Sequence, residues 1–414
     1  MMEHGKRKAT DLEGGRGVQA SPDKIVPAGD FDEVQEGRSA YLVACHWDWS
    51  RASKPFSVYK MDVGPSDAAL ASGRIRRSRL RRAASLEMAA GGKTFAAVRS
   101  RRRAWIVGAG GTAGDTVFFD TETRKVIAGP ALTSAKWNPI LTAVGDRVYA
   151  MSSTPSWVLD PNFPPWFEVL DLSEARVVTV DDRSHLEGCS WSALPIPPCM
   201  PWMLSPFEYH YKWLMVVVMS YAVVGPYILV SFNETWGTHA LDTNSLQWHK
   251  VDDERLPFFG CADPEGGSSI FLALSKRNGP LNAYRIRVAD SGKDDHALKL
   301  SITVLPVRCM EQPEVDEEPC FASLDNGRFC SLSLSVDSSS MTLHPEYLEL
   351  FPRKARVNLR IYQIENPESL LDAPEETLLA RKPKIRISSQ WERAFKISNS
   401  SQGFCPFSFT LLFV

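Results

Sequence analysis

Several sequence features that would point to a defined chemistry are missing from this chain. Its eight cysteines include no C-x-x-C pair, and its eight histidines include no two at the close spacing of metal ligands. No glycine-rich loop leads from a strand into a helix, as a phosphate-binding loop does. The sequence therefore predicts no metal, no cofactor and no catalytic residues, and we expect a protein that is not an enzyme.

Signals for secretion or membrane insertion are also scarce. The N-terminal stretch MMEHGKRKATDLEGG lacks an apolar core, so we expect no signal peptide, reduced thiols, and a cytoplasmic or nuclear location. One apolar run, 213–230, is nearly long enough to span a membrane. Its β-branched residues and its Gly225-Pro226 pair favour two adjacent strands joined by a turn, so we expect no membrane contact.

Neither sign of charge prevails, because the formal net charge is only −2. General affinity for nucleic acid is therefore not expected. Two arginine-rich segments, 74–82 and 99–103, could form a basic patch, but we interpret them as solvated loops. Residues 1–36 are polar and glycine-rich with almost no large apolar side chains, which predicts a disordered tail.

What the chain does contain is a repeated strand–turn–strand pattern. In three copies an apolar strand ends in Asp, a polar turn follows, and an apolar residue stands six positions after the Asp. The copies are Asp120 with Val126, Asp171 with Val177, and Asp242 with Trp248. An Asp side chain at the start of a turn can accept hydrogen bonds from backbone N–H groups ahead of it. Each copy therefore predicts a β-hairpin, with the apolar residue setting its register.

A second predicted hairpin precedes these, with its turn at Gly145-Asp146, Gly225-Pro226 or Asn326-Gly327. Two hairpins in series make four antiparallel strands, which is one blade of a β-propeller. We expect four blades at 95–129, 140–180, 221–251 and 269–305, and a fifth at 321–387. The strand pair 41–45 and 56–61 would form a sixth blade with Lys396-Ile397 or with 407–414, which would close the ring.

A family resemblance rests on particular segments. Gly110-Gly111 followed by Val117 to Thr121 resembles the double-glycine motif of a kelch repeat, whose period of about 50 residues is near the 171 − 120 = 51 between Asp120 and Asp171. The segments 220–223, 237–243, 256–260 and 326–330 are similar to a family of grass proteins classed as domain of unknown function 1668. The resemblance covers about 41–360 and implies a kelch-like propeller from a plant, without an established reaction.

Pattern and resemblance together predict an all-β fold: a single kelch-like propeller over 37–414, of about six or seven four-stranded blades. We expect it to act as a protein-interaction module, because propellers present loops from every blade on a rigid scaffold. Two alternatives remain: a copper-radical oxidase of the secreted type on the same fold, for which no site is visible, and a ubiquitin-ligase adaptor working with a separate subunit. The partner, a protein or peptide, cannot be named from the sequence.

Tryptophans mark the candidate interaction face. Eight of the twelve fall in loops that the strand assignment places on one side of the propeller, between strands two and three of a blade or between blades. They are Trp47, Trp49, Trp137, Trp157, Trp166, Trp191, Trp202 and Trp236. Trp is enriched at interface hot spots, so this face is our candidate partner site. Equally open is that these side chains fold inward and join the core.

Overall fold

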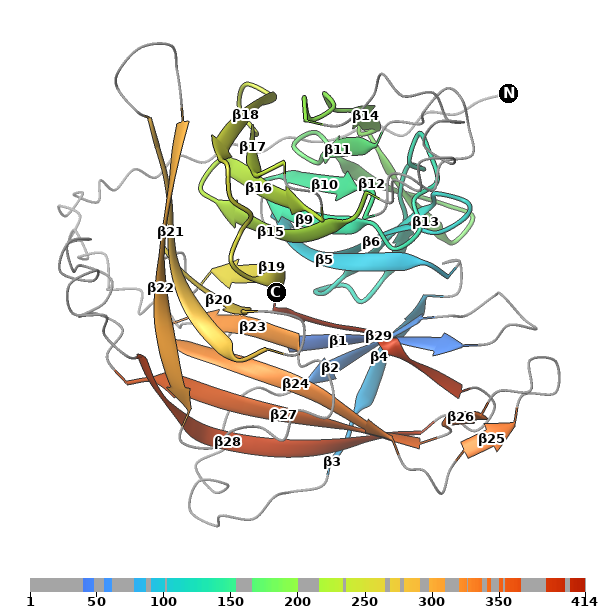
Figure 1. Ribbon diagram of the computed structural model, residues 1–414. Coiled ribbons are helices and arrows are strands. Elements are labelled where there is room, and N and C mark those ends of the chain that lie inside the picture. Colours follow the sequence, from blue (N-terminus) through green and yellow to red (C-terminus); the bar gives the residue numbers. More distant parts are fainter. Residues whose placement is uncertain are drawn as a thin grey trace, which may run out of the picture. The chain divides into compact units, whose positions relative to one another are not determined.

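Strands make up the regular structure of the protein, as the computed structural model in Figure 1 shows. The structure describes residues 40–47, 56–61, 78–86, 91–100, 103–153, 166–199, 216–233, 236–264, 269–275, 279–290, 298–309, 320–325, 327–336, 341–343, 350–352, 354–365, 385–398 and 403–413. All of these belong to the compact unit Arg38–Val414. The predicted disordered tail, 1–36, lies outside the described residues.

Most of the described strands can be grouped into six antiparallel sets of four, which we call quartets I to VI. Quartets IV, V and VI are continuous within one 13-stranded sheet, in which two parallel pairs of strands join them. Quartet I contains β29 (Gly403–Phe413), β1 (Ala40–Trp47), β2 (Phe56–Met61) and β4 (Arg81–Leu86). Quartet II contains β5 (Lys93–Ser100), β6 (Arg103–Gly110), β7 (Thr116–Asp120) and β8 (Val126–Ala128). Quartet III contains β9 (Ile140–Val144), β10 (Arg147–Met151), β11 (Phe167–Asp171) and β14 (Trp191–Ala193).

The second half of the chain forms the other three quartets. Quartet IV contains β15 (Val218–Val224), β16 (Tyr227–Phe232), β17 (Thr238–Asp242) and β18 (Gln247–Asp252). Quartet V contains β19 (Phe259–Pro264), β20 (Ile270–Leu274), β21 (Leu281–Asp290) and β22 (Leu298–Cys309). Quartet VI contains β23 (Cys320–Asp325), β24 (Arg328–Val336), β27 (Lys354–Ile364) and β28 (Ile385–Ser398).

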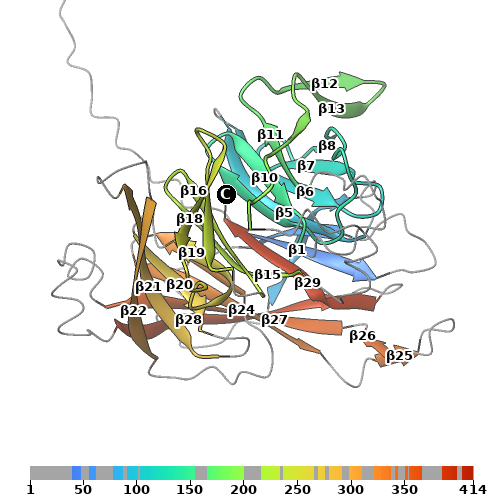
Figure 2. The same ribbon diagram turned by 45° about the horizontal axis from the view of Figure 1, so that its top comes forward.

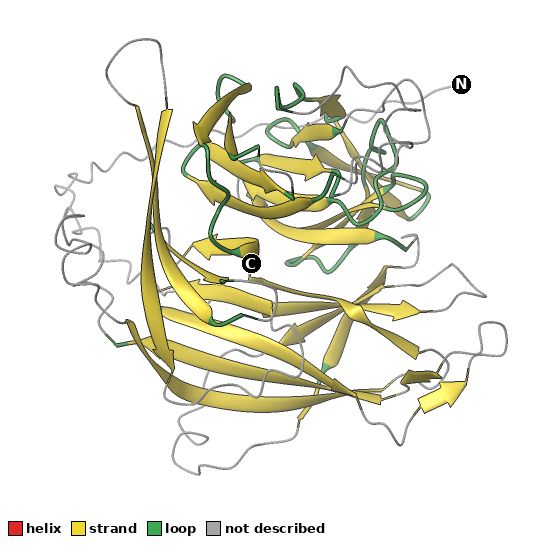
Figure 3. Ribbon diagram, in the orientation of Figure 1, coloured by secondary structure: helices red, strands yellow, loops and turns green. Residues whose placement is uncertain are grey.

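Five short strands lie outside the quartets. β3 (Ser78–Arg79) pairs with β28, and β25 (Met341–Leu343) pairs with β26 (Leu350–Pro352). β12 (Arg176–Val180) and β13 (Arg183–Glu187) form a hairpin that joins the edge of quartet II. Figure 3 shows strands and loops but no helix in the part of the chain that the structure describes. Within that part, no helix is long and apolar enough to cross a membrane.

Each quartet buries both of its faces, because side chains alternate along a strand. On β1, Ala40, Leu42 and Ala44 enter the cluster shared with quartet VI. Tyr41 and Val43 enter the cluster shared with quartet II. One such cluster lies between each two consecutive quartets, and a sixth joins VI to I. Each fully buried large side chain contributes about 1.5–3 kcal/mol, so these six clusters hold the quartets together.

The predicted tight turns are present. Val144 pairs with Arg147 around Gly145 (φ 57°), and Val224 pairs with Tyr227 around Gly225 (φ 56°). Such positive φ values favour glycine. The apolar run 213–230 is thus confirmed to contain two antiparallel strands, β15 and β16, in its described portion from 216 onward.

The predicted pairing of the two chain ends is confirmed as well. β29 runs antiparallel to β1, with Val43 opposite Thr410 and Leu42 opposite Leu411. The other candidate for this role, Lys396-Ile397, was wrong, because these residues belong to β28 and pair with β27. Strand order explains the difference: quartet VI needs β28 as its outer strand, which leaves the following segment for quartet I.

Three expectations about strand positions were wrong. Val177 does not follow Asp171 in a hairpin, because β12 pairs with β13, while β11 pairs with β14. Quartet V begins at Phe259 rather than at residue 269. The basic segment 74–82 is not wholly a loop, since its described residues include β3 and the start of β4.

Candidate functional site

Trp137 is the most exposed large apolar side chain among the described residues, with 57% of its surface accessible. It lies in the loop between β8 and β9, which connects quartets II and III. Its indole ring covers Gly92: a Cβ built on that glycine would come within 2.5 Å of Cε3 of the ring. Gly92 also has φ 79°, so both its conformation and its contact with Trp137 favour glycine. One face of the indole is thereby supported, while more than half of the side chain remains accessible.

Backbone hydrogen bonds tie this loop to Gly111 and Gly92. The N–H of Gly111 donates to the carbonyl of Lys136 at 2.8 Å, and the N–H of Asn138 donates to the carbonyl of Gly92 at 2.8 Å. A Cβ on Gly110 would lie 2.6 Å from Cδ of Pro139. The Gly110-Gly111 pair, which carries the kelch resemblance, therefore makes room for the neighbouring loop.

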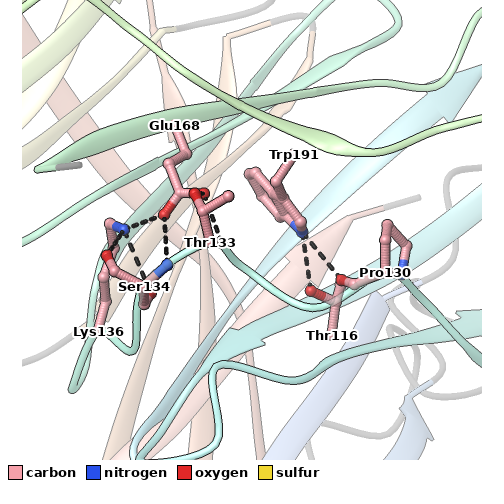
Figure 4. Close-up of polar contacts among 7 residues, drawn as sticks. All are labelled: Thr116, Pro130, Thr133, Ser134, Lys136, Glu168 and Trp191. Atoms are coloured by element: carbon pink, nitrogen blue, oxygen red, sulfur yellow. Dashed lines mark hydrogen bonds and ion pairs between the residues drawn. The ribbon is translucent and has the colours of Figure 1, made fainter. Parts of the chain in front are cut away.

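A buried ion pair anchors the same loop from inside. The ammonium of Lys136 contacts Oε1 of Glu168, and the two side chains are 2% and 0% exposed (Figure 4). The N–H of Thr133 donates to Oε2 of Glu168 at 2.8 Å, and Lys136 Nζ donates to Ser134 Oγ at 2.9 Å. Burial lowers the pKa of Lys136, and Glu168 partly offsets that effect. Because both charges are engaged, the pair fixes the loop to β11 of quartet III.

A second buried lysine supports the neighbouring turn, 111–115. Nζ of Lys93 donates to the carbonyls of Gly110 at 2.7 Å and Asp115 at 2.8 Å, and forms an ion pair of 2.6 Å with Oδ1 of Asp115. This turn lies alongside the Trp137 loop, because the N–H of Leu132 donates to the carbonyl of Gly114 at 2.8 Å. Both loops are thus held by buried charges at their bases.

Apart from Trp137, the exposed residues of these two loops are small and uncharged. They are Thr112, Ala113, Ala131, Thr133, Ala135 and Asn138. We call Trp137 together with these six residues the Trp137 patch. It presents a supported aromatic ring whose own two loops carry one partly exposed charge, Asp115, which is paired with Lys93, an arrangement suited to apolar contact with a partner.

Two of the predicted face residues are buried instead. Trp191 is 5% exposed, lies on β14, and donates from Nε1 to Thr116 Oγ1 at 3.0 Å and to the carbonyl of Pro130 at 3.1 Å (Figure 4). Its placement in a loop between blades was therefore wrong. Trp166 is 4% exposed and packs between quartets III and IV. For these two residues the inward alternative holds.

Of the other predicted face residues apart from Trp137, only Trp236 has a side chain that the structure describes. Trp236 is half-buried, with its ring centroid 5.6 Å from that of Phe232. Trp47 ends β1, and its side chain is not described. Trp49, Trp157 and Trp202 lie outside the described residues. Trp137 is therefore the member of the set that the structure shows to be accessible.

The sequence analysis missed the two buried lysines and Glu168. One signal was available: Glu168 interrupts the apolar strand Phe167–Asp171, and a charge within such a strand needs a partner. His239 is another buried polar residue that went unnoticed, and burial lowers its pKa. Among the described residues, no three His, Cys, Asp or Glu side chains gather as metal ligands would.

Comparison with known proteins gives a family and distant structural matches. The model of the family described as "Protein of unknown function (DUF1668)" matches residues 37–384. No curated protein matches this chain. A structure of a proposed 6-phosphogluconolactonase from Bacteroides uniformis is 10% identical, with a TM-score of 0.38 and coverage of 91% of this chain and 100% of that one.

Two further structures show similarly distant likeness. The β-propeller domain of Myceliophteria thermophila Cps50 (Swd1) is 9% identical, with a TM-score of 0.34 and coverage of 78% of this chain and 83% of that one. The structure of YjhT is 10% identical, with a TM-score of 0.37 and coverage of 65% of this chain and 81% of that one.

Proposed function

This chain belongs to the DUF1668 family of proteins of unknown function, and on that premise we propose that it is a kelch-like propeller serving as a protein-interaction module. The family assigns no reaction, so the proposal has to rest on the chain's own residues. Two features support it: the connected order of the six quartets, and the supported, accessible indole of Trp137.

The order of the apolar clusters supports a closed ring of six blades. Five clusters join consecutive quartets and the sixth, which contains Leu42 of quartet I and Leu359 of quartet VI, joins the last quartet to the first. The leading strands of the quartets also meet: β29 contacts β5 and β23, β15 contacts β19, and β19 contacts β23. In a propeller these strands surround the central axis.

Closure by the two chain ends supports the same arrangement. β1, β2 and β4 come from the beginning of the chain and β29 from its end, so one blade combines both. The described residues thereby leave no free edge on β1, which has β2 on one side and β29 on the other. A rigid ring of this kind holds its connecting loops in fixed positions, and binding proteins depend on such positioning.

The Trp137 patch carries the functional part of the proposal. Exposing an indole to water costs free energy that contact with a partner would recover. Its loop is fixed from below by Lys136 and Glu168 and laterally by Gly92 and Gly111, so binding would not have to order it. We therefore place the partner, a protein or peptide, over this patch, in a cytoplasmic or nuclear setting and without nucleic acid or membrane.

A capture experiment tests this assignment. Purified wild-type protein and the Trp137→Ala variant are used as bait in an extract of grass tissue, the source that the family resemblance suggests. Because truncating a hot-spot residue costs about 2 kcal/mol or more, recovery of the specific partners should fall at least ten-fold.

The matched control is Val304→Ala, a substitution at another exposed apolar residue, on β22 of quartet V. It should leave recovery unchanged, and thermal unfolding should confirm that both variants fold. Equal recovery by wild type and Trp137→Ala would contradict the assignment of the patch.

A further inference from the structure

The hairpin of β12 and β13 leaves its own quartet and extends another one. It follows β11 of quartet III in the chain, but β13 pairs in parallel with β8 of quartet II, with Ser184 opposite Ile127 and His185 opposite Ala128. This places β12 at the end of a six-stranded sheet. In Figure 2 the hairpin stands at the border of the described strands. Among the described residues β12 pairs only with β13, so no described strand pairs with its other edge.

The turn of this hairpin determines which backbone groups face the open edge. Asp181 (φ 47°) and Asp182 (φ 61°) both have positive φ, as the two central residues of a type I′ turn do. The flanking residues, Val180 and Arg183, are then hydrogen-bonded to each other. Because hydrogen-bonded and non-bonded positions alternate along an antiparallel strand, Val177 and Thr179 direct their N–H and C=O groups away from β13.

The side chains of β12 give this edge little protection against pairing. Its sequence is RVVTV, with a single charge and no proline, and its pairing with β13 has no bulge. Protected edge strands carry charges, prolines or bulges along their length. Val180 is 54% exposed, while Val177 packs partly against the cluster between quartets II and III. The edge is thus β-branched, accessible and firmly attached to the core.

We propose that β12 pairs antiparallel with β12 of a second copy of this chain. Hydrogen bonds at the outward positions require Val177 to stand opposite Thr179 of the other copy, which places Val178 opposite Val178. In this register Arg176 stands opposite Val180 of the other copy, beside the acidic turn residues Asp181 and Asp182, although Glu174 comes opposite Asp182. A parallel copy in register would instead place Arg176 opposite Arg176 and would align the two acidic turns.

The resulting contact joins two hairpins into one four-stranded sheet, β13-β12-β12-β13. Such a contact involves about five residues per copy. The area it buries is therefore far below the roughly 1,200 Å² that stable interfaces bury. The dimer should therefore be weak, and the fraction of chains in the dimer should rise with protein concentration. It does not depend on the Trp137 patch, which involves other loops.

Sedimentation across a concentration series tests the dimer. The weight-average mass of wild-type protein should rise from the monomer value toward twice that value as concentration increases. Val178→Lys would place two ammonium groups opposite each other at the centre of the contact, and like charges in that position are destabilising. This variant should remain monomeric at concentrations where the wild type dimerises.

Val304→Lys is the matched control, because it introduces the same charge at an exposed valine of β22. It should dimerise like the wild type. Hydrogen exchange provides the positional test: the amides of Val177 and Thr179 should gain protection at high concentration in the wild type only. A wild type that stays monomeric, equal behaviour of both lysine variants, or a dimer without protection at these amides would overturn the proposal.

Discussion

Quartets III and IV contain the same turn but complete their sheets with different segments. In both, an Asp side chain caps the turn: Oδ1 of Asp171 accepts from the N–H of Ser173 at 2.9 Å, and Oδ1 of Asp242 accepts from the N–H of Asn244 at 2.9 Å. In quartet IV the next strand, β18, returns directly along β17. In quartet III the next strand, β12, leaves, and the fourth position goes to β14.

A tryptophan occupies the fourth strand in both quartets. In quartet IV it is Trp248, directly opposite Leu241, with Nε1 donating to the carbonyl of Pro195 at 2.8 Å. In quartet III it is Trp191, opposite Leu170, with its hydrogen bonds to quartet II. The turn is therefore a local structure set by Asp, whereas the strand that completes a quartet is chosen by its packing against the neighbouring quartet.

The largest effect should come from removing the tryptophan that joins quartets II and III. Trp191→Ala removes a nearly fully buried side chain, and such truncations cost about 3–5 kcal/mol of unfolding free energy. Trp248→Ala removes a half-buried ring and should cost less. Denaturant unfolding of both variants measures the difference. Equal losses would mean that the two fourth strands contribute alike and that the comparison drawn above fails.

Breaking the buried ion pair should lower the unfolding free energy by a similar amount, but with a different signature. Lys136→Met leaves the carboxylate of Glu168 buried without its cation, and breaking one partner of such a pair costs about 3–5 kcal/mol at most. The double variant Lys136→Met/Glu168→Leu removes both charges and should be more stable than the single one. If the double variant lost as much unfolding free energy as Lys136→Met and Glu168→Leu lose when added together, the two charges would not be coupled.

The smallest change in unfolding free energy should come from replacing the aspartates that cap the two turns. Partial burial opposes ionisation of Asp171 and Asp242, but hydrogen bonds from Ser173 and Asn244 outweigh it and lower the pKa of each carboxyl from 3.8. A lowered folded pKa gives stability that is present above pH 4 and is lost as pH falls through the folded pKa. Asp171→Asn and Asp242→Asn should each make the loss of stability at low pH less steep.

Both aspartates are partly exposed and screened by solvent, so each contribution should be only about 0.5 kcal/mol or less. Unfolding measured between pH 2 and pH 6 provides the check. An acid decline of unchanged slope in both variants would show that these carboxylates do not contribute to it.

Local signals predicted a large part of the fold. Gly145 and Gly225 indicated tight turns, the apolar run 213–230 indicated two adjacent strands, and the apolar segment 407–414 indicated a strand that needs a partner. These features depend on a few neighbouring residues, so they can be read from the sequence. Trp137 was assigned in the same way to a loop between blades, but exposure and inward folding were equally open for it, and the structure shows it exposed.

Several of the departures concern the choice between neighbouring quartets. Nothing near Val177 in sequence shows that β12 will join β13 and quartet II, because the decisive contacts come from Trp191 and Thr116. Trp166 and Trp191 look like loop residues until the adjacent quartet covers them. Period-two alternation predicts that a side chain is buried, but it does not identify the quartet that covers it.

Quartet I provides the most direct test of the proposed ring, because its leading strand comes from the far end of the chain. The measurement is the unfolding free energy of a chain that ends at Ser398 and therefore lacks β29. The account predicts a loss of several kcal/mol and a loss of hydrogen-exchange protection in β1, where Val43 now pairs with Thr410. A truncated chain with the stability and the β1 protection of the full chain would contradict closure by β29.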